Sequence, residues 1–194
     1  MDLIHFFLEF LGDPLTTLTG IIRDYGVYIY LFLFLVIFIE TGVVVMPLLP
    51  GDSLLFAVGL IAATPGQIDI YTVIQLLVFA GLLGDNVNYF IGKKFGDYIQ
   101  SKERILFLKK SHIEDTEKYF AENGGKTVIL ARFIPIVRTI APFVAGAGEM
   151  KYRTYLLYCI SGAFLWVTSI TLLGYFLGNI EWVKLNFEKF VLGI

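Results

Sequence analysis

Residues 154–180 read TYLLYCISGAFLWVTSITLLGYFLGNI, and none of them is charged. A helix needs roughly 20 apolar residues to cross the hydrocarbon core of a bilayer, which is about 30 Å thick. Two further blocks have the same character, because residues 26–47 carry one charge, Glu40, and residues 70–92 carry one, Asp85. We therefore predict an all-α integral membrane protein with spanning helices at residues 26–45, 70–92 and 152–178.

The composition of the whole chain agrees with this class of protein. Of the 194 residues, 57% are hydrophobic and 16% are charged, whereas a soluble domain has about 25% charged residues. The mean hydropathy is +0.74. Cys159 is the only cysteine, so no disulfide can form within the chain. Because it lies in an apolar block, we interpret it as a small buried hydrophobic residue.

Both ends of the chain are predicted to lie at the membrane surface. Residues 1–22 open with Asp2 instead of a basic cluster, which argues against a signal peptide. They mix aromatic and acidic side chains, as an interfacial helix does. Residues 180–194 form a C-terminal tail that is too short to cross again, with Trp182 as an interface anchor.

The loop at residues 93–126 sets the predicted orientation. Its basic residues are Lys93, Lys94, Lys102, Arg104, Lys109, Lys110, Lys118 and Lys126. Basic loops stay in the cytoplasm, so we predict that this loop is cytoplasmic. Ser111 and Glu114 have the spacing of a capping box, which predicts a short surface helix. We interpret it as a solvated linker in preference to a lipid-headgroup contact.

Two apolar segments are interrupted by proline and do not fit simple spanning helices. The first covers residues 46–65 and the second covers residues 127–148. Non-helical backbone at membrane depth is tolerated only inside protein or beside a wet cavity. We therefore predict two re-entrant helical hairpins. Their expected breaks are at Pro47, Pro50 and Gly51 in the first and at Pro135 and Pro142 in the second.

The two halves of the chain follow the same plan. Each has a broken hairpin and then a helix that ends in glycines four residues apart, Gly92 and Gly96 in the first half and Gly174 and Gly178 in the second. Such glycines let helices pack closely. The predicted orientation makes the halves run oppositely through the membrane. The fold class predicted is therefore a single membrane domain, residues 1–194, built as an inverted repeat of hairpin plus transmembrane helix, with an N-terminal interfacial helix.

Charged residues in apolar segments are the candidates for function, because a charge at the bilayer centre costs about 2.5–3.5 kcal/mol on insertion scales. Glu40 and Asp52 accompany the first hairpin, and Arg132 and Arg138 belong to the second. If the hairpins face each other, acids and arginines meet. The sequence leaves open whether Asp85 has a function or only bonds to a neighbour. Those neighbours are Asn86, Asn88 and Tyr89.

The arginines suggest a phosphate site. The planar guanidinium binds phosphate oxygens through two parallel hydrogen bonds and stays charged. Arg132 and Arg138, on either side of Pro135, could converge on one phosphate. A nearby carboxylate would compete for them, and protonating it would release them. The structural alternative is a set of static ion pairs that fixes the hairpins.

An enzymatic function is not expected. The only histidines, His5 and His112, lie outside the core segments, and no catalytic serine motif, zinc motif or Cys/His metal cluster is present. Asp52 and Asp85 alone do not support an aspartyl protease. We expect no catalytic residues, no metal, no cofactor and no nucleic-acid partner. An ion channel or an assembly factor remains an alternative.

Several ordered motifs resemble those of the DedA family, also called the SNARE-associated or VTT-domain family. They cover about residues 25–180, and the departure is Lys93, where arginine is expected. The motifs are Glu40-Thr41-Gly42, Leu49-Pro50-Gly51-Asp52-Ser53-Leu54-Leu55, Gly84-Asp85-x-x-x-Tyr89-x-x-Gly92-Lys93-x-x-Gly96, Ala131-Arg132-Phe133-x-Pro135-x-x-Arg138-Thr139 with Ala145-Gly146 and Met150, Phe120-x-x-Asn123-Gly124, and Gly162-Ala163-x-x-Trp166.

The resemblance implies a multi-pass protein of the bacterial cytoplasmic membrane that returns undecaprenyl phosphate across it, with possible proton coupling. It also implies roles for four residues, Arg132 and Arg138 as phosphate ligands and Glu40 and Asp52 in coupling and gating, with Asp85 and Tyr89 secondary. The expected partners are membrane lipids, an anionic lipid phosphate, and protons or another cation. A homo-oligomer stays open. Alternatives within the family are a non-selective phospholipid scramblase and a phosphatidylethanolamine flippase.

Overall fold

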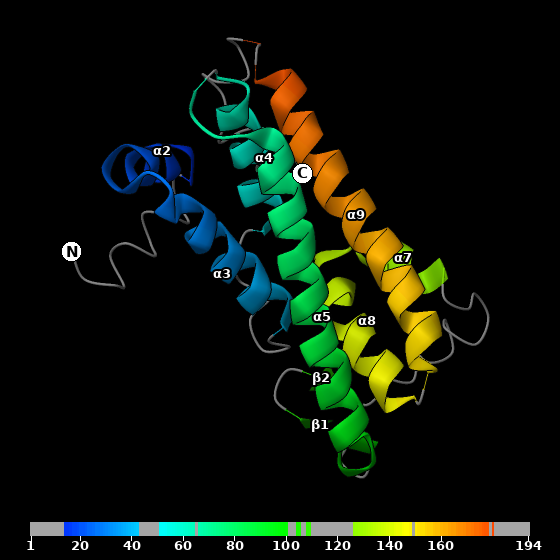
Figure 1. Cartoon of the computed structure of the whole chain (residues 1–194). Helices are drawn as coiled ribbons and strands as arrows, with labels where there is room; N and C mark the ends of the chain where they lie inside the picture. The colour runs from blue at the N-terminus through cyan, green and yellow to red at the C-terminus, as the bar shows by residue number, and fades with distance from the viewer. Residues whose placement is uncertain are drawn as a thin grey trace. The chain divides into compact units, whose positions relative to one another are not determined.

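The structure is a computed structural model (Figure 1) that describes residues 14–42, 51–64, 66–100, 104–105, 108–109, 126–148, 150–178 and 180. Their regular structure is α-helical apart from two strands of two residues each. The chain divides into two compact units. Unit 1 takes its described residues from Met1–Val36, Leu49–Leu77 and Val167–Ile194, and unit 2 takes them from Ile37–Leu48 and Val78–Trp166.

Two long helices, α5 (Ile70–Gln100) and α9 (Tyr152–Leu177), dominate the described chain (Figure 1). The 26 residues of α9 span about 39 Å at 1.5 Å per residue, which exceeds the bilayer core. Among the described helices, Ile70–Phe95 and Tyr152–Leu177 are long and apolar enough to cross a membrane. These two stretches confirm the helices predicted at residues 70–92 and 152–178.

The predicted end of the first long helix was wrong by eight residues. It continues past Gly92 to Gln100, because Gly92 does not terminate it. Gly92 lies instead where the helix packs against the backbone of Phe143, and lysine, which follows it twice, is a good helix former. Asp69 marks the other end of α5. Its carboxylate accepts a hydrogen bond of 2.7 Å from the backbone N–H of Thr72, which is the contact that an N-cap makes.

Unit 1 begins with α2 (Pro14–Tyr25) and the first part of α3 (Tyr28–Gly42). The prediction of an interfacial helix at residues 1–22 falls partly outside the described residues, and α2 ends three residues later than expected. Gly26, at a φ of 54°, forms the turn between the two helices. The described part of the helix predicted at residues 26–45 is α3, which has 15 residues.

Unit 1 also contains α4 (Gly51–Ala62), a short apolar helix that is buried from Leu54 to Ile61. It packs against α9 through glycines on both sides. A Cβ on Gly59 would collide with the backbone of Thr171, and a Cβ on Gly174 would collide with the backbone of Phe56. Of the breaks predicted in this hairpin, Gly51 is the first residue of α4, whereas Pro47 and Pro50 lie outside the described residues.

Unit 2 contains two short helices, α7 (Lys126–Ala131) and α8 (Pro135–Ala147), where the second hairpin was predicted. The break lies just before Pro135, at Ile134, whose backbone is extended (φ −115°, ψ 107°). Proline suits the first helical position, because its fixed φ is helical and its missing N–H is not needed there. The predicted break is thus confirmed at Pro135.

A second break at Pro142 was predicted, and this prediction was wrong. The helix α8 runs through Pro142 to Ala147. An interior proline removes one backbone hydrogen bond, but helices in membranes tolerate this because neighbouring helices and side chains satisfy the freed carbonyl. Gly146 and Gly92 then bring α8 and α5 together, because a Cβ on Gly146 would collide with the backbone of Tyr89.

The basic loop contains structure that the sequence did not predict. Strand β1 (Arg104–Ile105) pairs antiparallel with β2 (Leu108–Lys109). The surface helix predicted after Ser111 lies outside the described residues, as does the tail after Ile180.

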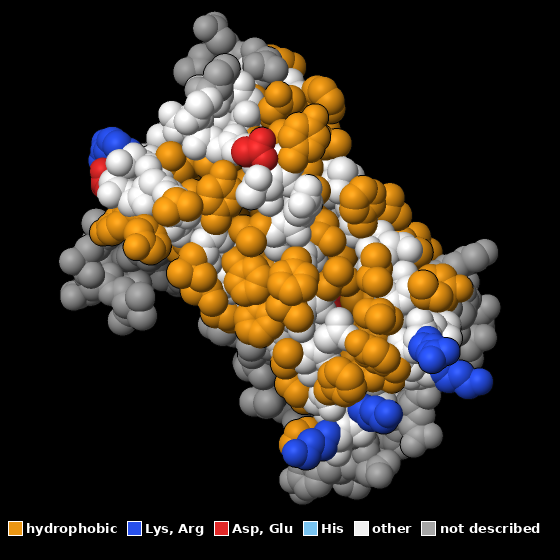
Figure 2. All heavy atoms as spheres, in the orientation of Figure 1, with side chains coloured by type: hydrophobic (Ala, Val, Ile, Leu, Met, Phe, Trp, Pro, Cys, Tyr) orange, Lys and Arg blue, Asp and Glu red, His pale blue; other side chains and the backbone are white. Residues whose placement is uncertain are grey.

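Large apolar side chains cover the exposed surface of the long helices (Figure 2). Phe79 and Phe90 on α5, and Leu157, Phe164 and Phe176 on α9, are each more than half exposed. Contiguous exposed apolar surface is uncommon on soluble monomers and marks contact with a partner or a membrane. On helices long enough to span, it is the surface expected to face lipid.

Candidate functional site

Two buried ion pairs form the candidate site, and both lie in unit 2. Arg138 Nη2 donates to Glu40 Oε1 at 2.8 Å, and Arg132 Nη2 is paired with Asp85 Oδ2. All four side chains are buried, with at most 4% of any residue exposed. A buried charge is tolerated only when it is paired and hydrogen-bonded, so these residues are held together by strong electrostatic attraction.

Helix ends and a helix break place three of these four side chains. Glu40 lies in the last turn of α3, and Arg138 lies in the first turn of α8, where its backbone N–H donates to Ile134 O at 2.8 Å. Arg132 lies in the break between α7 and α8, and Asp85 is in the middle of α5. The predicted meeting of acids and arginines is therefore confirmed for Glu40 and Arg138, which are 98 residues apart.

Trp166 brings the two guanidinium groups to one place. The Cζ of Arg138 lies 4.4 Å from the centre of the indole ring, and the Cζ of Arg132 lies 5.9 Å from it. Because both distances are measured to the same ring, the two Cζ atoms cannot be farther apart than the sum of these distances. The ring is fully buried, where cation–π attraction is strongest because no water competes.

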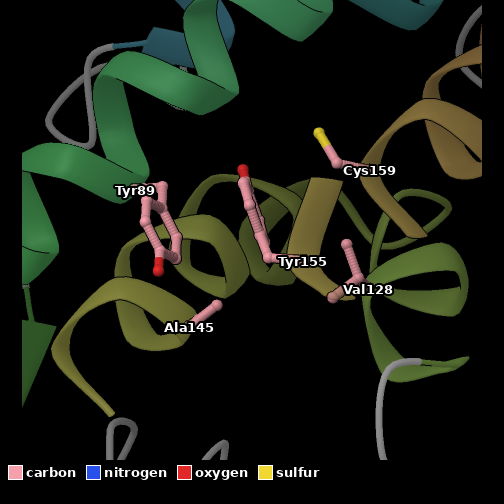
Figure 3. Close-up of a cluster of buried hydrophobic side chains, with 5 residues drawn as sticks. All are labelled: Tyr89, Val128, Ala145, Tyr155 and Cys159. Carbon is pink, nitrogen blue, oxygen red and sulfur yellow. The ribbon is translucent and has the colours of Figure 1, made fainter. Parts of the chain in front are cut away.

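Asp85 pairs with Arg132 and also contacts α9. The thiol of Cys159 donates to Asp85 Oδ2 at 3.2 Å, and Arg132 Nη2 donates to Cys159 Sγ at 3.4 Å. Tyr155 Oη donates to the backbone carbonyl of Asp85 at 3.0 Å. Figure 3 shows Tyr155 and Cys159 on the same helix, with the ring of Tyr155 beside that of Tyr89. Asp85 therefore belongs to the site.

The sequence predicted that Cys159 is a small buried hydrophobic residue. The burial is confirmed, but the residue also makes polar contacts. It is fully buried, and its sulfur contacts both members of an ion pair. A signal for this was present, because Tyr155, Cys159, Gly162 and Trp166 follow one another at spacings of four, three and four. Such spacings place side chains on one face of a helix. Gly162 leaves room for Arg132, whose side chain lies 3.3 Å from where a Cβ would be.

Asn88 is a second residue that the sequence singled out only as a neighbour of Asp85. Its Nδ2 donates to Thr139 O at 2.7 Å and to Thr41 O at 3.3 Å, and its side chain is fully buried. It therefore ties α5 to the end of α3 and to the N-terminal part of α8. These are the two segments that carry Glu40 and Arg138, so Asn88 supports the geometry of that pair.

Some hydrogen-bonding capacity remains at the site. Among the described residues, Arg132 Nη1, Asp85 Oδ1 and Asn88 Oδ1 are buried and have no hydrogen-bond partner. A buried donor or acceptor without a partner costs about 1–3 kcal/mol. A polar ligand that bonded to Arg132 Nη1 would relieve such a cost. Within the described ranges, no group of three His, Cys, Asp or Glu could hold a metal ion.

The remaining predicted site residues have other surroundings. Asp52 is in the first turn of α4 in unit 1 and is half-buried, and its role stays a prediction. Tyr89 donates from its hydroxyl to Met150 O at 2.5 Å and stacks on Tyr155 with ring centres 4.4 Å apart. These contacts give Tyr89 a packing role beside the ion pairs.

Comparison with known proteins identifies relatives along the whole chain. The VTT domain matches residues 49–176. Protein DedA of Escherichia coli (strain K12) is 44% identical over 195 residues, which cover 100% of this chain and 89% of that protein. An uncharacterized membrane protein of Mycobacterium leprae is 43% identical over 82% of this chain and 71% of its own length. Inner membrane protein YqjA of Escherichia coli (strain K12) is 32% identical over 151 residues, which cover 78% of this chain and 68% of that protein. No solved structure matches.

Proposed function

The chain belongs to the DedA family of VTT-domain membrane proteins, and we propose that it carries a lipid phosphate across the bilayer, with undecaprenyl phosphate as the substrate. The observation that carries the proposal is the pair of arginines buried beside one tryptophan ring, each matched with a carboxylate. Two neighbouring guanidinium groups suit a phosphate, because each can bind two of its oxygens.

The carboxylates act as competitors for the same guanidinium edges. When Glu40 is protonated it loses its attraction for Arg138, and the phosphate of the lipid takes its place. The contacts of Asp85 support the same part for it at Arg132, and Asp52 keeps its predicted part in proton coupling. The prenyl tail stays in the surrounding lipid, so only the headgroup enters the protein.

The inverted repeat belongs to this proposal, and the glycine contacts support it. In unit 1, α4 meets α9 at Phe56 and Gly59; in unit 2, α8 meets α5 at Phe143 and Gly146. The partner helices also use a glycine three residues after the contacted backbone, at Gly174 and Gly92. The same contact thus recurs in both units 87 residues apart on the short helices, as expected of two re-entrant hairpins related by a repeat.

We place the chain in the bacterial cytoplasmic membrane, with the basic segment at residues 93–126, which begins with the last turns of α5, in the cytoplasm. Rocking of the two half-repeats would then open the arginine site alternately to each side. The protein moves its substrate without forming or breaking a covalent bond, so it is not an enzyme in this proposal.

Reconstitution into liposomes tests the proposal. Flipping of labelled undecaprenyl phosphate is measured with and without a pH gradient. Arg132→Lys and Arg138→Lys should each lose most of the flipping, because lysine is a point charge that cannot make the two-bonded fork. Arg23→Lys is the matched control, since Arg23 is an exposed arginine of unit 1 that pairs only with its neighbour Asp24 among the described residues.

Three outcomes would contradict the proposal. Full flipping in both site variants removes the phosphate site. Flipping of zwitterionic phospholipids at an equal rate, without dependence on the gradient, indicates a scramblase. Ion conductance without any lipid movement indicates a channel.

A further inference from the structure

Four exposed cations lie on the described part of unit 2, apart from the buried arginines. Lys93 and Lys94 follow the apolar part of α5, and Lys151 and Arg153 are at the start of α9. Every exposed charged side chain that the structure describes in this unit is basic. Among the described side chains, none of the ion pairs involves any of these four cations.

Specific contacts bring the two pairs of cations to one place. Tyr152 Oη donates to Asn86 Oδ1 at 2.8 Å, and the rings of Tyr152 and Phe90 lie 5.5 Å apart. The short bond from the hydroxyl of Tyr89 to Met150 O joins the same two segments. The start of α9 is therefore fixed beside residues 86–90 of α5. Lys93 and Lys94 follow Phe90 in the sequence, and Lys151 and Arg153 stand on either side of Tyr152.

The flanked rings are themselves exposed. Phe90 is 51% exposed and Tyr152 is 39% exposed, and Lys94 Nζ lies 5.8 Å from the ring centre of Phe95. Aromatic rings of this kind sit at the headgroup level of a membrane, while lysine and arginine extend their charged ends towards water. Leu157, five residues into α9 and 69% exposed, lies about 7.5 Å farther along the helix, on the apolar side of the rings.

We propose that Phe90, Tyr152, Lys93, Lys94, Lys151 and Arg153 form a docking site for the headgroups of anionic phospholipids in the leaflet that they face. The partner is a bilayer lipid and not a soluble phosphate, because the basic groups border exposed apolar surface of a chain that belongs to a family of membrane proteins (Figure 2). The site requires only that the chain is embedded in a membrane, so it stands whether or not the protein carries a lipid phosphate.

Lipid selectivity measured by electron paramagnetic resonance tests the site. The full chain is placed in phosphatidylcholine bilayers that contain a trace of spin-labelled phosphatidylglycerol or spin-labelled phosphatidylcholine. The ratio of motionally restricted label gives the preference for the anionic lipid. The variant changes Lys93, Lys94, Lys151 and Arg153 to Gln, and Arg23→Gln is the control, because it removes one exposed charge from unit 1.

The parent and the control should prefer the anionic lipid at low salt by about fivefold, the factor that one basic residue near an anionic surface can give. The preference should disappear in the variant, and salt at about 1 M should abolish it in the parent, because the Debye length is then only about 3 Å. If the fourfold variant does not insert, Lys93→Gln with Lys94→Gln, and Lys151→Gln with Arg153→Gln, are measured separately and should each lose part of the preference.

The proposal is overturned if the parent shows no preference or if the variants retain it in full. It is also overturned if glycerol phosphate in solution displaces the labelled lipid, because the site would then bind free anions.

Discussion

The guanidinium carbon of Arg138 lies over the ring of Trp166, while its Nη2 donates to Glu40 Oε1. In the proposed mechanism the carboxylate of Glu40 leaves while the cation of Arg138 remains buried, and a desolvated cation–π contact is worth about 2 kcal/mol. The cation–π attraction of the ring stabilises a lone cation more than it stabilises a neutral ion pair. We therefore expect Trp166→Leu to slow lipid phosphate flipping about tenfold, and Trp166→Phe to slow it less.

Flipping rates over a range of substrate concentrations measure the effect of these Trp166 variants. The fall should be in the maximal rate, and circular dichroism should show that the helices are retained. Equal rates in the Leu and Phe variants would mean that the ring only fills space.

Asp69 gives a pH dependence that can be followed at the start of α5. Hydrogen bonds from the hydroxyl and the backbone N–H of Thr72 hold the pKa of Asp69 below its ordinary value. A carboxyl group with a lowered pKa in the folded state stabilises it above the unfolded pKa, about 3.9, and this contribution is lost as the pH falls through the folded value. The first turn of α5 should therefore fray only below about pH 4.

Hydrogen–deuterium exchange at residues 70–73, corrected for the intrinsic rate at each pH, measures this fraying. Asp69→Asn should keep the cap, because asparagine is as good at this position, and should remove the pH dependence. Fraying with the same pH profile in the variant would assign it to another group.

The sequence identified the buried charges of the site but not their full pairing. Glu40, Arg132 and Arg138 were found because isolated charges in apolar blocks are costly. The pairing of Arg132 with Asp85 depends on how α5 packs beside the break after α7, and residue spacing alone does not encode that packing. Asn88 was overlooked as a bridge for the same reason, since both of its acceptors are backbone carbonyls more than 40 residues away.

At the scale of elements, the close approach of α8 and α5 depends on Gly146. An added Cβ would collide with the backbone of Tyr89, and backbone cannot move aside as a flexible side chain can. Overpacking of this kind typically costs about 1–3 kcal/mol. We expect Gly146→Ala to lower the thermal stability of the protein in detergent and Gly59→Ala, at the matching contact of α4, to lower it similarly.

Gly20→Ala is the control for these two substitutions, because a Cβ on Gly20 in α2 would meet nothing within 4 Å and alanine favours a helix. Its melting temperature should be unchanged or slightly raised. Parental stability in Gly146→Ala would show that the two helices are free to separate.

The sequence predicted the existence of the long helices better than their ends. A run of apolar residues specifies that a helix forms, whereas its last residue depends on packing, and so Gly92 was mistaken for a terminator. Pro142 was mistaken for a break because proline weakens a helix locally, while the packing of α8 against α5 through Gly146 holds it together. The strands β1 and β2 are too short to leave a pattern that a sequence could reveal.

For the molecule as a whole, the orientation in the membrane is the property to test. If α5 crosses, its two ends face opposite compartments. In a Cys159→Ala background, Lys94→Cys should react with a membrane-impermeant maleimide only in inside-out vesicles, because basic loops remain in the cytoplasm. Gln67→Cys, before the start of α5, should react only in intact spheroplasts.

Labelling of both positions from the same side would show that α5 does not cross, and reversed labelling would show the opposite orientation.

The membrane class itself was predictable from the sequence, because it depends on the overall hydrophobic composition of the chain. The proposed repeat is visible in the sequence only as a similar spacing of prolines and glycines in the two halves.

Cys159 has one practical consequence. It is the only sulfhydryl in the chain, and it is completely enclosed next to the Arg132–Asp85 pair. An alkylating reagent can reach it only when the surrounding helices part. The rate of its alkylation therefore measures how often the packed interior opens, in the native protein and without an introduced cysteine.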